Sequence, residues 1–193
     1  MSSLEIVAAL FGVVSVSLSV RQNIWSWPTA IVNVGLYIFV FYDSKLYADT
    51  GLQVIYVVLN AYGWYHWLYG GKNRTELPVT RTPVRVGVLL SGIVVAGTAL
   101  IGTLLIRNTD ASLPYLDALT TSTSLVAQWM MTRKLLENWL VWVAVDVVYI
   151  GMYINKSLYV TAVLYFVFLL LSIMGFIQWR RTLGRTKAEL AAA

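Results

Sequence analysis

One carboxylate stands inside an apolar stretch in the second half of the chain. The stretch ENWLVWVAVDVVY carries Asp146 among apolar and aromatic side chains. On an α-helix this acid shares one face with three aromatic residues, Trp139, Trp142 and Tyr149. At a rise of 1.5 Å per residue, Asp146 would lie roughly 12 Å from Asn138, close to the middle of a bilayer. A charge at that depth costs at least ~2.5–3.5 kcal/mol, so the acid is expected to face a bundle interior or a water-filled cavity.

Other apolar stretches carry polar stripes that could face the same acid. The stripes have the three- to four-residue spacing that is typical of one helix face. Their amides, hydroxyls and rings belong to Asn33, Tyr37, Gln53, Tyr56, Asn60, Ser124 and Gln128. Aromatic faces attract organic cations, and each such contact contributes ~2 kcal/mol or more in a desolvated pocket. The combination therefore suits a small, ring-bearing, cationic solute that carries hydroxyl or amide groups.

A structural interpretation of the same residues stays open. A protonated Asp146 could hydrogen-bond to Asn33 or Ser124 and hold two helices together. Gln53 and Asn60 could likewise be fasteners between helices. Rings near the ends of apolar stretches are typical of the aromatic belt at a membrane surface, and we expect this role for most of them. These rings are Trp25, Trp27, Trp64, Trp67, Tyr69 and Trp179.

The composition shows what must position these residues. The chain has 193 residues, of which 59% are hydrophobic and 12% are charged, and its mean hydropathy is +0.71. Soluble domains average about 45–50% apolar and about 25% charged residues, so this is a multi-pass membrane protein. The excess of apolar residues is not confined to one end, so a secretory signal does not explain it. The net charge of +5 arises from residues between and after apolar stretches, so it needs no nucleic-acid partner.

The sequence lacks the residues that several classes of catalytic and metal-binding site require. The chain has no cysteine, which excludes disulfides, thiolate metal sites and cysteine catalysis. It contains neither a glycine-rich phosphate loop nor zinc-ligand spacing. The hydroxyl run TTSTS has no base near it in sequence. We therefore expect no catalytic residues, no cofactor and no metal.

Seven segments are long and apolar enough to cross about 30 Å of hydrocarbon as helices. They are residues 4–20, 25–42, 50–69, 84–106, 117–132, 138–154 and 157–179. The fifth is rich in hydroxyl groups and would have to turn them toward other helices. The sequence predicts an all-α membrane protein with one transporter domain, residues 1–183, and a cytoplasmic tail, residues 184–193.

The basic residues predict the orientation of the chain. Eleven of them fall on one side of the predicted spans: Arg21, Lys72, Arg74, Arg81, Arg85, Arg133, Lys134, Arg180, Arg181, Arg185 and Lys187. Three fall on the other side, Lys45, Arg107 and Lys156. Because Lys and Arg concentrate on the cytoplasmic side, we expect the N-terminus outside and the C-terminus inside.

The chain also repeats itself at one constant spacing, which we call the repeat offset and define as the spacing from Arg21 to Arg133. Without any gap, the same offset aligns Trp27 with Trp139, Gly63 with Gly175 and Trp67 with Trp179. Three crossings reverse the chain, so one linker helix, at 84–106, must restore the starting side before the second triplet begins. The expected architecture is a parallel 3+1+3 repeat, which occurs in transporters whose substrate lies between the repeats.

Several longer motifs resemble the PnuC family of bacterial vitamin transporters. They are LYADTGLQVIYVVLNAYGWYHW at 46–67, MMTRKLLENWLVWVAVDVV at 130–148 and GFIQW at 175–179. The resemblance covers nearly the whole chain. It implies a seven-helix fold related to the SWEET sugar transporters and a homotrimer in the bacterial inner membrane. It also implies facilitated import of nicotinamide riboside, trapped afterwards by a cytoplasmic kinase.

The resemblance leaves the solute open. It matches Trp139 and Trp142 to the family's W-x-x-W motif, and Gln53 and Asn60 to its polar positions on the third helix. Family members for nicotinamide riboside can carry asparagine where this chain has Asp146. Other relatives carry thiamine or riboflavin, and thiamine, also a cation, suits an acid equally well. An alternative from another functional class is a membrane enzyme, or a receptor that binds the vitamin without transporting it.

Asp146 also raises the question of energy coupling. Acids inside the membrane often relay protons, but a relay normally needs further titratable groups. No other Asp, Glu, His or Lys lies in the predicted core of the spans, so we expect a passive carrier with Asp146 as the counter-charge.

Overall fold

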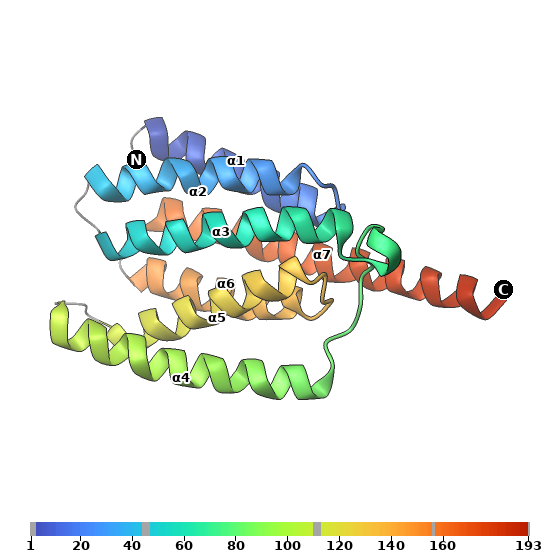
Figure 1. The fold of residues 1–193 in the computed structure, drawn as a ribbon. Coiled ribbons are helices and arrows are strands. Elements are labelled where there is room, and N and C mark those ends of the chain that lie inside the picture. Colours follow the sequence, from blue (N-terminus) through green and yellow to red (C-terminus); the bar gives the residue numbers. More distant parts are fainter. Residues whose placement is uncertain (1–2, 44–46, 110–112, 156, 193) are drawn as a thin grey trace.

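Helices make up almost all of the computed structural model, which describes residues 3–43, 47–109, 113–155 and 157–192. They are α1 (Ser3–Val20), α2 (Ser26–Asp43), α3 (Tyr47–Tyr69), the short 3-10 helix η1 (Lys72–Arg74), α4 (Val84–Asn108), α5 (Pro114–Thr132), α6 (Asn138–Asn155) and α7 (Tyr159–Ala192). Consecutive α-helices run in opposite directions, so the two termini lie at opposite ends of the bundle (Figure 1). We call these ends the N-terminal end and the C-terminal end. Lys45 and Lys156, which were used to predict orientation, lie outside the described residues.

The predicted spans agree with the observed helices at every boundary except the C-terminal end of α7. Elsewhere the largest difference is three residues, where α3 begins at Tyr47 instead of 50 and α5 begins at Pro114 instead of 117. The exception is α7, which continues past 179 to Ala192. The apolar pattern ends near Trp179, but a helix that leaves the membrane can continue with polar residues.

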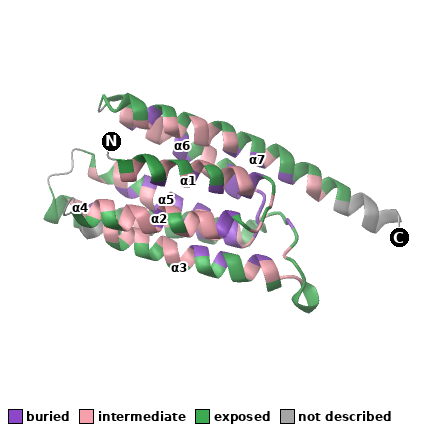
Figure 2. Cartoon of the chain, turned by 90° about the horizontal axis from the view of Figure 1, so that it is seen from above, coloured by how far each residue is buried: buried purple, intermediate pink, exposed green. Residues whose placement is uncertain are grey.

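Among the residues that the structure describes, four helices have the length and hydropathy of membrane spans by themselves. They are Ser3–Val20, Val84–Asn108, Asn138–Asn155 and Tyr159–Arg185. Large apolar side chains also lie on the outer surface, such as Leu10, Val95 and Val163, which are 61%, 69% and 63% exposed. Exposed and half-buried residues cover most of the length of α3, α4 and α6 (Figure 2). This surface suits lipid, whereas it would be unusual for a soluble protein.

Six of the seven described α-helices form a closed ring. The packed neighbours around it are α1 and α2, α2 and α3, α3 and α5, α5 and α6, α6 and α7, and α7 and α1. The remaining helix, α4, lies on the outside and packs against α5 (Figure 1).

Two turns at the C-terminal end have the same local structure. Between α1 and α2, the amide of Gln22 donates to the carbonyl of Ser19 over 2.9 Å. Between α5 and α6, the amide of Lys134 donates to the carbonyl of Met131 over 3.0 Å, so donor and acceptor are both shifted by the repeat offset. Gln22 and Lys134 also share a positive φ, 55° and 48°. The offset in the sequence therefore corresponds to matching turns.

The segment between α3 and α4 is hydrogen-bonded to the turn between α5 and α6. Thr80 receives a hydrogen bond from the amide of Leu136 over 2.8 Å and donates its own amide to the carbonyl of Lys134 over 3.1 Å. The amide and the hydroxyl of Thr82 both donate to Glu137 Oε2 over 2.7 Å. Val79 is 6% exposed, so the segment also covers part of the core.

Three tryptophans that were expected at the membrane surface lie in the core instead. Trp27, Trp67 and Trp179 are 2%, 2% and 0% exposed and form one apolar cluster with Trp139. The expectation of an aromatic belt is wrong for them, because each lies where two helices pack closely at the C-terminal end. Trp25 and Trp64, at 64% and 39% exposed, lie on the surface.

Candidate functional site

A cavity of about 1210 Å³ lies within the ring of helices. All six helices of the ring contribute side chains to its wall, and α4 adds Ile101 and Leu105. Toward the C-terminal end it reaches the buried residues Trp27, Met131 and Trp139. A volume of this size has room for a small vitamin together with water.

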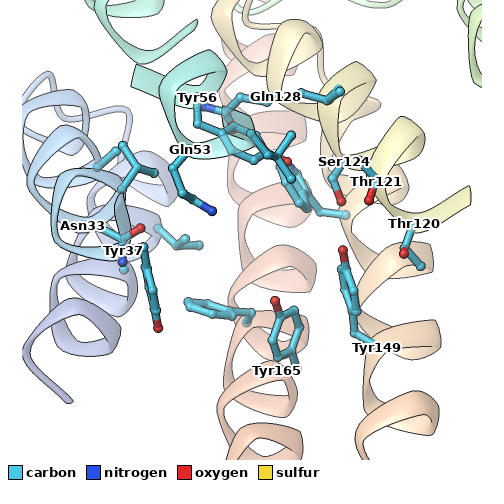
Figure 3. A pocket seen from close by; sticks show the side chains of 18 of the residues that line it. Asn33, Tyr37, Gln53, Tyr56, Thr120, Thr121, Ser124, Gln128, Tyr149 and Tyr165 are labelled. Atoms are coloured by element: carbon cyan, nitrogen blue, oxygen red, sulfur yellow. The ribbon is translucent and has the colours of Figure 1, made fainter. Parts of the chain in front are cut away.

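Every residue that the sequence predicted for the site lines this cavity. These residues are Asn33, Tyr37, Gln53, Tyr56, Asn60, Ser124, Gln128, Trp139, Trp142, Asp146 and Tyr149. They come from α2, α3, α5 and α6, and the fold brings their polar faces together. Figure 3 shows Asn33 and Tyr37 on one side of the cavity, facing Ser124 and Tyr149 on the other. The amide of Gln53 points between these two walls.

Asp146 lies eight residues after Asn138, the first residue of α6, and it is 3% exposed. Its Oδ2 accepts a hydrogen bond from the hydroxyl of Ser172 on α7 over 3.2 Å. The partners considered from the sequence, Asn33 and Ser124, do not make this bond. One hydroxyl satisfies only part of what a carboxylate can accept.

The amides in the cavity have partners in neighbouring helices. Gln128 Nε2 on α5 donates to Asn60 Oδ1 on α3 over 2.7 Å. Asn33 Nδ2 on α2 donates to the carbonyl oxygen of Ala8 on α1 over 2.6 Å. These bonds fix the positions of the amides and also tie adjacent helices together. The fastener role weighed for Asn60 is therefore present, and it leaves further polar atoms on each amide.

Tyrosines gather in the half of the cavity toward the N-terminal end. The ring of Tyr165 on α7 lies 4.8 Å from Tyr149 and 5.1 Å from Tyr153, centroid to centroid. Tyr165 and Ser172 were missed from the sequence, because α7 is apolar nearly all round and shows no polar stripe. Both line the cavity beside the predicted residues.

Three carboxylates line the cavity near the N-terminal end. Glu5, Asp49 and Asp117 each lie in the first turn of a helix, on α1, α3 and α5. These three helices begin at the same end of the bundle (Figure 1). An acidic approach to an aromatic cavity favours a cationic solute over an anionic one.

Tryptophans pack against one another at the C-terminal end of the cavity. Trp27 meets Trp67 edge to face at 5.1 Å, and Trp139 meets Trp179 in the same way at 5.4 Å. Lys134 Nζ lies 4.5 Å from the centroid of Trp67 and is 5% exposed. Burial lowers the pKa of Lys134, whereas the carboxylate of Glu76 acts in the opposite direction.

The part of the chain that the structure describes contains no cluster of side chains that could bind a metal ion. There, no group of three or more His, Cys, Asp or Glu side chains could hold a metal ion. His66, the single histidine of the chain, contacts Arg133 Nη1 through Nε2 at 3.2 Å.

Comparison with known proteins gives consistent matches over nearly the whole chain. The nicotinamide riboside transporter PnuC of Escherichia coli is 25% identical, and the match covers 93% of this chain and 85% of that protein. The riboflavin/roseoflavin transporter RibM of Streptomyces davaonensis is 24% identical, with 91% and 83% covered. A crystal structure of the vitamin B3 transporter PnuC superposes with a TM-score of 0.75 at 27% identity, covering 94% of this chain and 82% of that one.

These matches agree with the apolar helices and with the polar cavity that they enclose. The sequence profile of the family described as nicotinamide mononucleotide transporter matches residues 2–181. The chain is therefore a multi-pass transporter of the inner membrane and belongs to the nicotinamide mononucleotide transporter family.

Proposed function

We propose that this protein imports nicotinamide riboside by facilitated diffusion and that a cytoplasmic kinase then traps the vitamin by phosphorylation. The observation that carries the proposal is that one cavity joins a buried carboxylate, aromatic rings and amides. Nicotinamide riboside has a cationic pyridinium ring, a carboxamide and a hydroxyl-rich ribose, so each part of the vitamin has a chemical counterpart in the cavity. The three carboxylates near the N-terminal end would raise the local concentration of a cation.

The predicted residues divide into three roles. Asp146 balances the charge of the pyridinium ring, and Trp139, Trp142 and Tyr149 offer aromatic faces to it. The side chains of Gln53, Tyr56, Asn60, Gln128, Asn33, Tyr37 and Ser124 hydrogen-bond the carboxamide and ribose. Because Asn60 and Gln128 already bond to each other, one solute group can engage both helices at once.

The carrier would work as two similar halves around the cavity. In this proposal α1–α3 and α5–α7 form the 3+1+3 repeat, with α4 as the linker, the N-terminus outside and the C-terminus inside. The matching turns around Gln22 and Lys134 support the repeat, since their positions and φ angles correspond at the repeat offset. Rocking of two similar halves about a central cavity would expose it to each side in turn. The homotrimer expected from the family resemblance stays a prediction.

Riboflavin is the second candidate solute, because the similar RibM protein is named for it. Riboflavin is uncharged, so its binding would not need the acid in the cavity. Thiamine is a third candidate solute, because it is a cation with an aromatic ring. The buried Asp146 favours the two cations over riboflavin.

Calorimetric titration of the purified protein with the three vitamins tests the choice. We expect nicotinamide riboside to bind most tightly, and thiamine and riboflavin to bind at least tenfold more weakly, a difference of about 1.4 kcal/mol or more. Tight binding of thiamine or riboflavin, without a response to nicotinamide riboside, would overturn the proposed solute but not the family.

A further inference from the structure

Four buried tryptophans form two pairs, each related by the repeat offset. In the first pair, Trp67 Nε1 donates to the carbonyl of Met131 over 2.9 Å, and Trp179 Nε1 donates to the carbonyl of Ser19 over 3.1 Å. Each bond reaches from one half of the chain to the other. The two donors are separated by the repeat offset, and so are the two acceptors. The indole N–H groups of Trp67 and Trp179 therefore have equivalent hydrogen-bond partners.

The second pair, Trp27 and Trp139, differs in one respect. Both side chains are buried, at 2% and 1% exposed, yet neither indole N–H has a hydrogen-bond partner among the described residues. Both tryptophans line the cavity, whereas Trp67 and Trp179 are not part of its wall. A buried N–H donor is normally satisfied, and indole nitrogen can only donate.

Packing holds the ring of Trp27 at this place. A methyl group at Gly63 would overlap the six-membered part of its ring, so the indole lies directly against the backbone of α3. The ring of Trp27 also meets the ring of Trp67 at 90°. Beside it in sequence, the buried hydroxyl of Ser26 also lacks a partner in the described structure and also lines the cavity.

We propose that the indole N–H of Trp27 binds an oxygen acceptor of the transported solute, a hydroxyl or a carbonyl group. Trp27 would then be a specificity-determining residue from the first half of the chain, and Trp139 is its counterpart at the repeat offset in the second half. The inference rests on the proposed function, because it assumes that the solute occupies this cavity. It adds a residue that the polar stripes did not predict, although the repeat offset pairs it with Trp139.

Replacement of Trp27 by phenylalanine tests the donor, with affinity for nicotinamide riboside measured by calorimetry and stability by thermal unfolding. We expect Trp27→Phe to weaken binding about tenfold, which corresponds to about 1.4 kcal/mol. The melting temperature should fall only by the cost of the gap that the smaller ring leaves in the buried cluster, because no protein acceptor loses its partner. Trp67→Phe should lower the melting temperature, because it leaves the carbonyl of Met131 without the indole donor. The exposed Trp25→Phe should change neither quantity.

A shape-preserving substitution separates the N–H from the size of the ring. Incorporation of 3-benzothienylalanine at position 27 replaces the N–H by sulfur and keeps two fused rings. Weakened binding in this variant supports the proposal, whereas wild-type affinity would overturn it and leave water as the partner of the N–H. If the wild-type protein binds none of the three vitamins, the proposed function fails first, so the two failures are distinguishable.

Discussion

At the scale of single residues, we propose that the charge of Asp146 determines which solutes the cavity can accept. The carboxylate is buried in the wall of the cavity, and the hydroxyl of Ser172 is its hydrogen-bond donor. Burial disfavours a charged carboxylate, and one hydrogen bond offsets only part of that cost. A cation that approaches the carboxylate closely therefore stabilises it. In the proposed transport cycle the vitamin supplies that cation.

Asp146→Asn removes the charge and keeps the shape of the side chain. We expect affinity for nicotinamide riboside to fall about ten- to hundredfold, because a charge-assisted interaction of roughly 1–3 kcal/mol is lost. The reduced, uncharged dihydro form of the same riboside is the matched control, and its affinity should change little. Equal binding of both forms by wild-type and variant, with a lower melting temperature for the variant, would make Asp146 a structural fastener.

Some site residues were predictable from the sequence and others were not. Asp146 was predictable because a carboxylate in an apolar helix has few possible locations, and Gln53 and Asn60 because they share one face of their helix. Ser172 was not, because a single small hydroxyl in an apolar helix gives no periodic signal. Trp27 was assigned to the membrane surface because rings near helix ends usually lie there, and only its packing against Gly63 reveals otherwise.

At the scale of helices, two glycines allow close packing on α3 and on α7. A methyl group at Gly63 would overlap Trp27, and one at Gly175 would overlap Trp139. The two glycines are separated by the repeat offset, and so are the two tryptophans. One indole ring therefore packs directly on the backbone of α3, and another packs directly on the backbone of α7.

Gly63→Ala and Gly175→Ala should each lower the melting temperature, because overpacking typically costs about 1–3 kcal/mol. Gly151→Ala is the control on α6, since nothing lies within 4 Å of the added methyl group. It should leave the melting temperature unchanged or raise it slightly, because alanine favours a helix over glycine by up to about 1 kcal/mol. Thermal unfolding of the three variants in the same detergent checks this. Equal melting temperatures for all three would contradict the close packing.

The positions of the helices were largely predictable, because hydropathy reports the length of a membrane span directly. The end of α7 was not, since the apolar pattern stops near Trp179 while the backbone remains helical to Ala192. The helices α2, α3 and α5 were predicted as spans from the sequence. The structure shows helices there, although they are not apolar enough to qualify as spans alone. Their polar residues face the cavity instead of lipid, which explains their lower hydropathy.

At the scale of the whole molecule, the ring of six helices explains why the polar residues can be tolerated in a membrane. The cavity removes them from lipid, and the outer faces carry apolar side chains. The helix order and the repeat offset could be read from the sequence. Which faces meet could not, because helix rotation depends on packing between segments far apart in the chain, such as α1 against α7.

The central claim is that this cavity moves nicotinamide riboside across a bilayer without an energy source. Uptake of labelled riboside into proteoliposomes tests it most directly. The account predicts that label equilibrates to equal concentrations inside and outside, that an uncoupler has no effect, and that an enclosed riboside kinase with ATP drives accumulation. Binding without any uptake would identify a receptor, and accumulation without a kinase that collapses with an uncoupler would identify a coupled transporter. Either result would contradict the account.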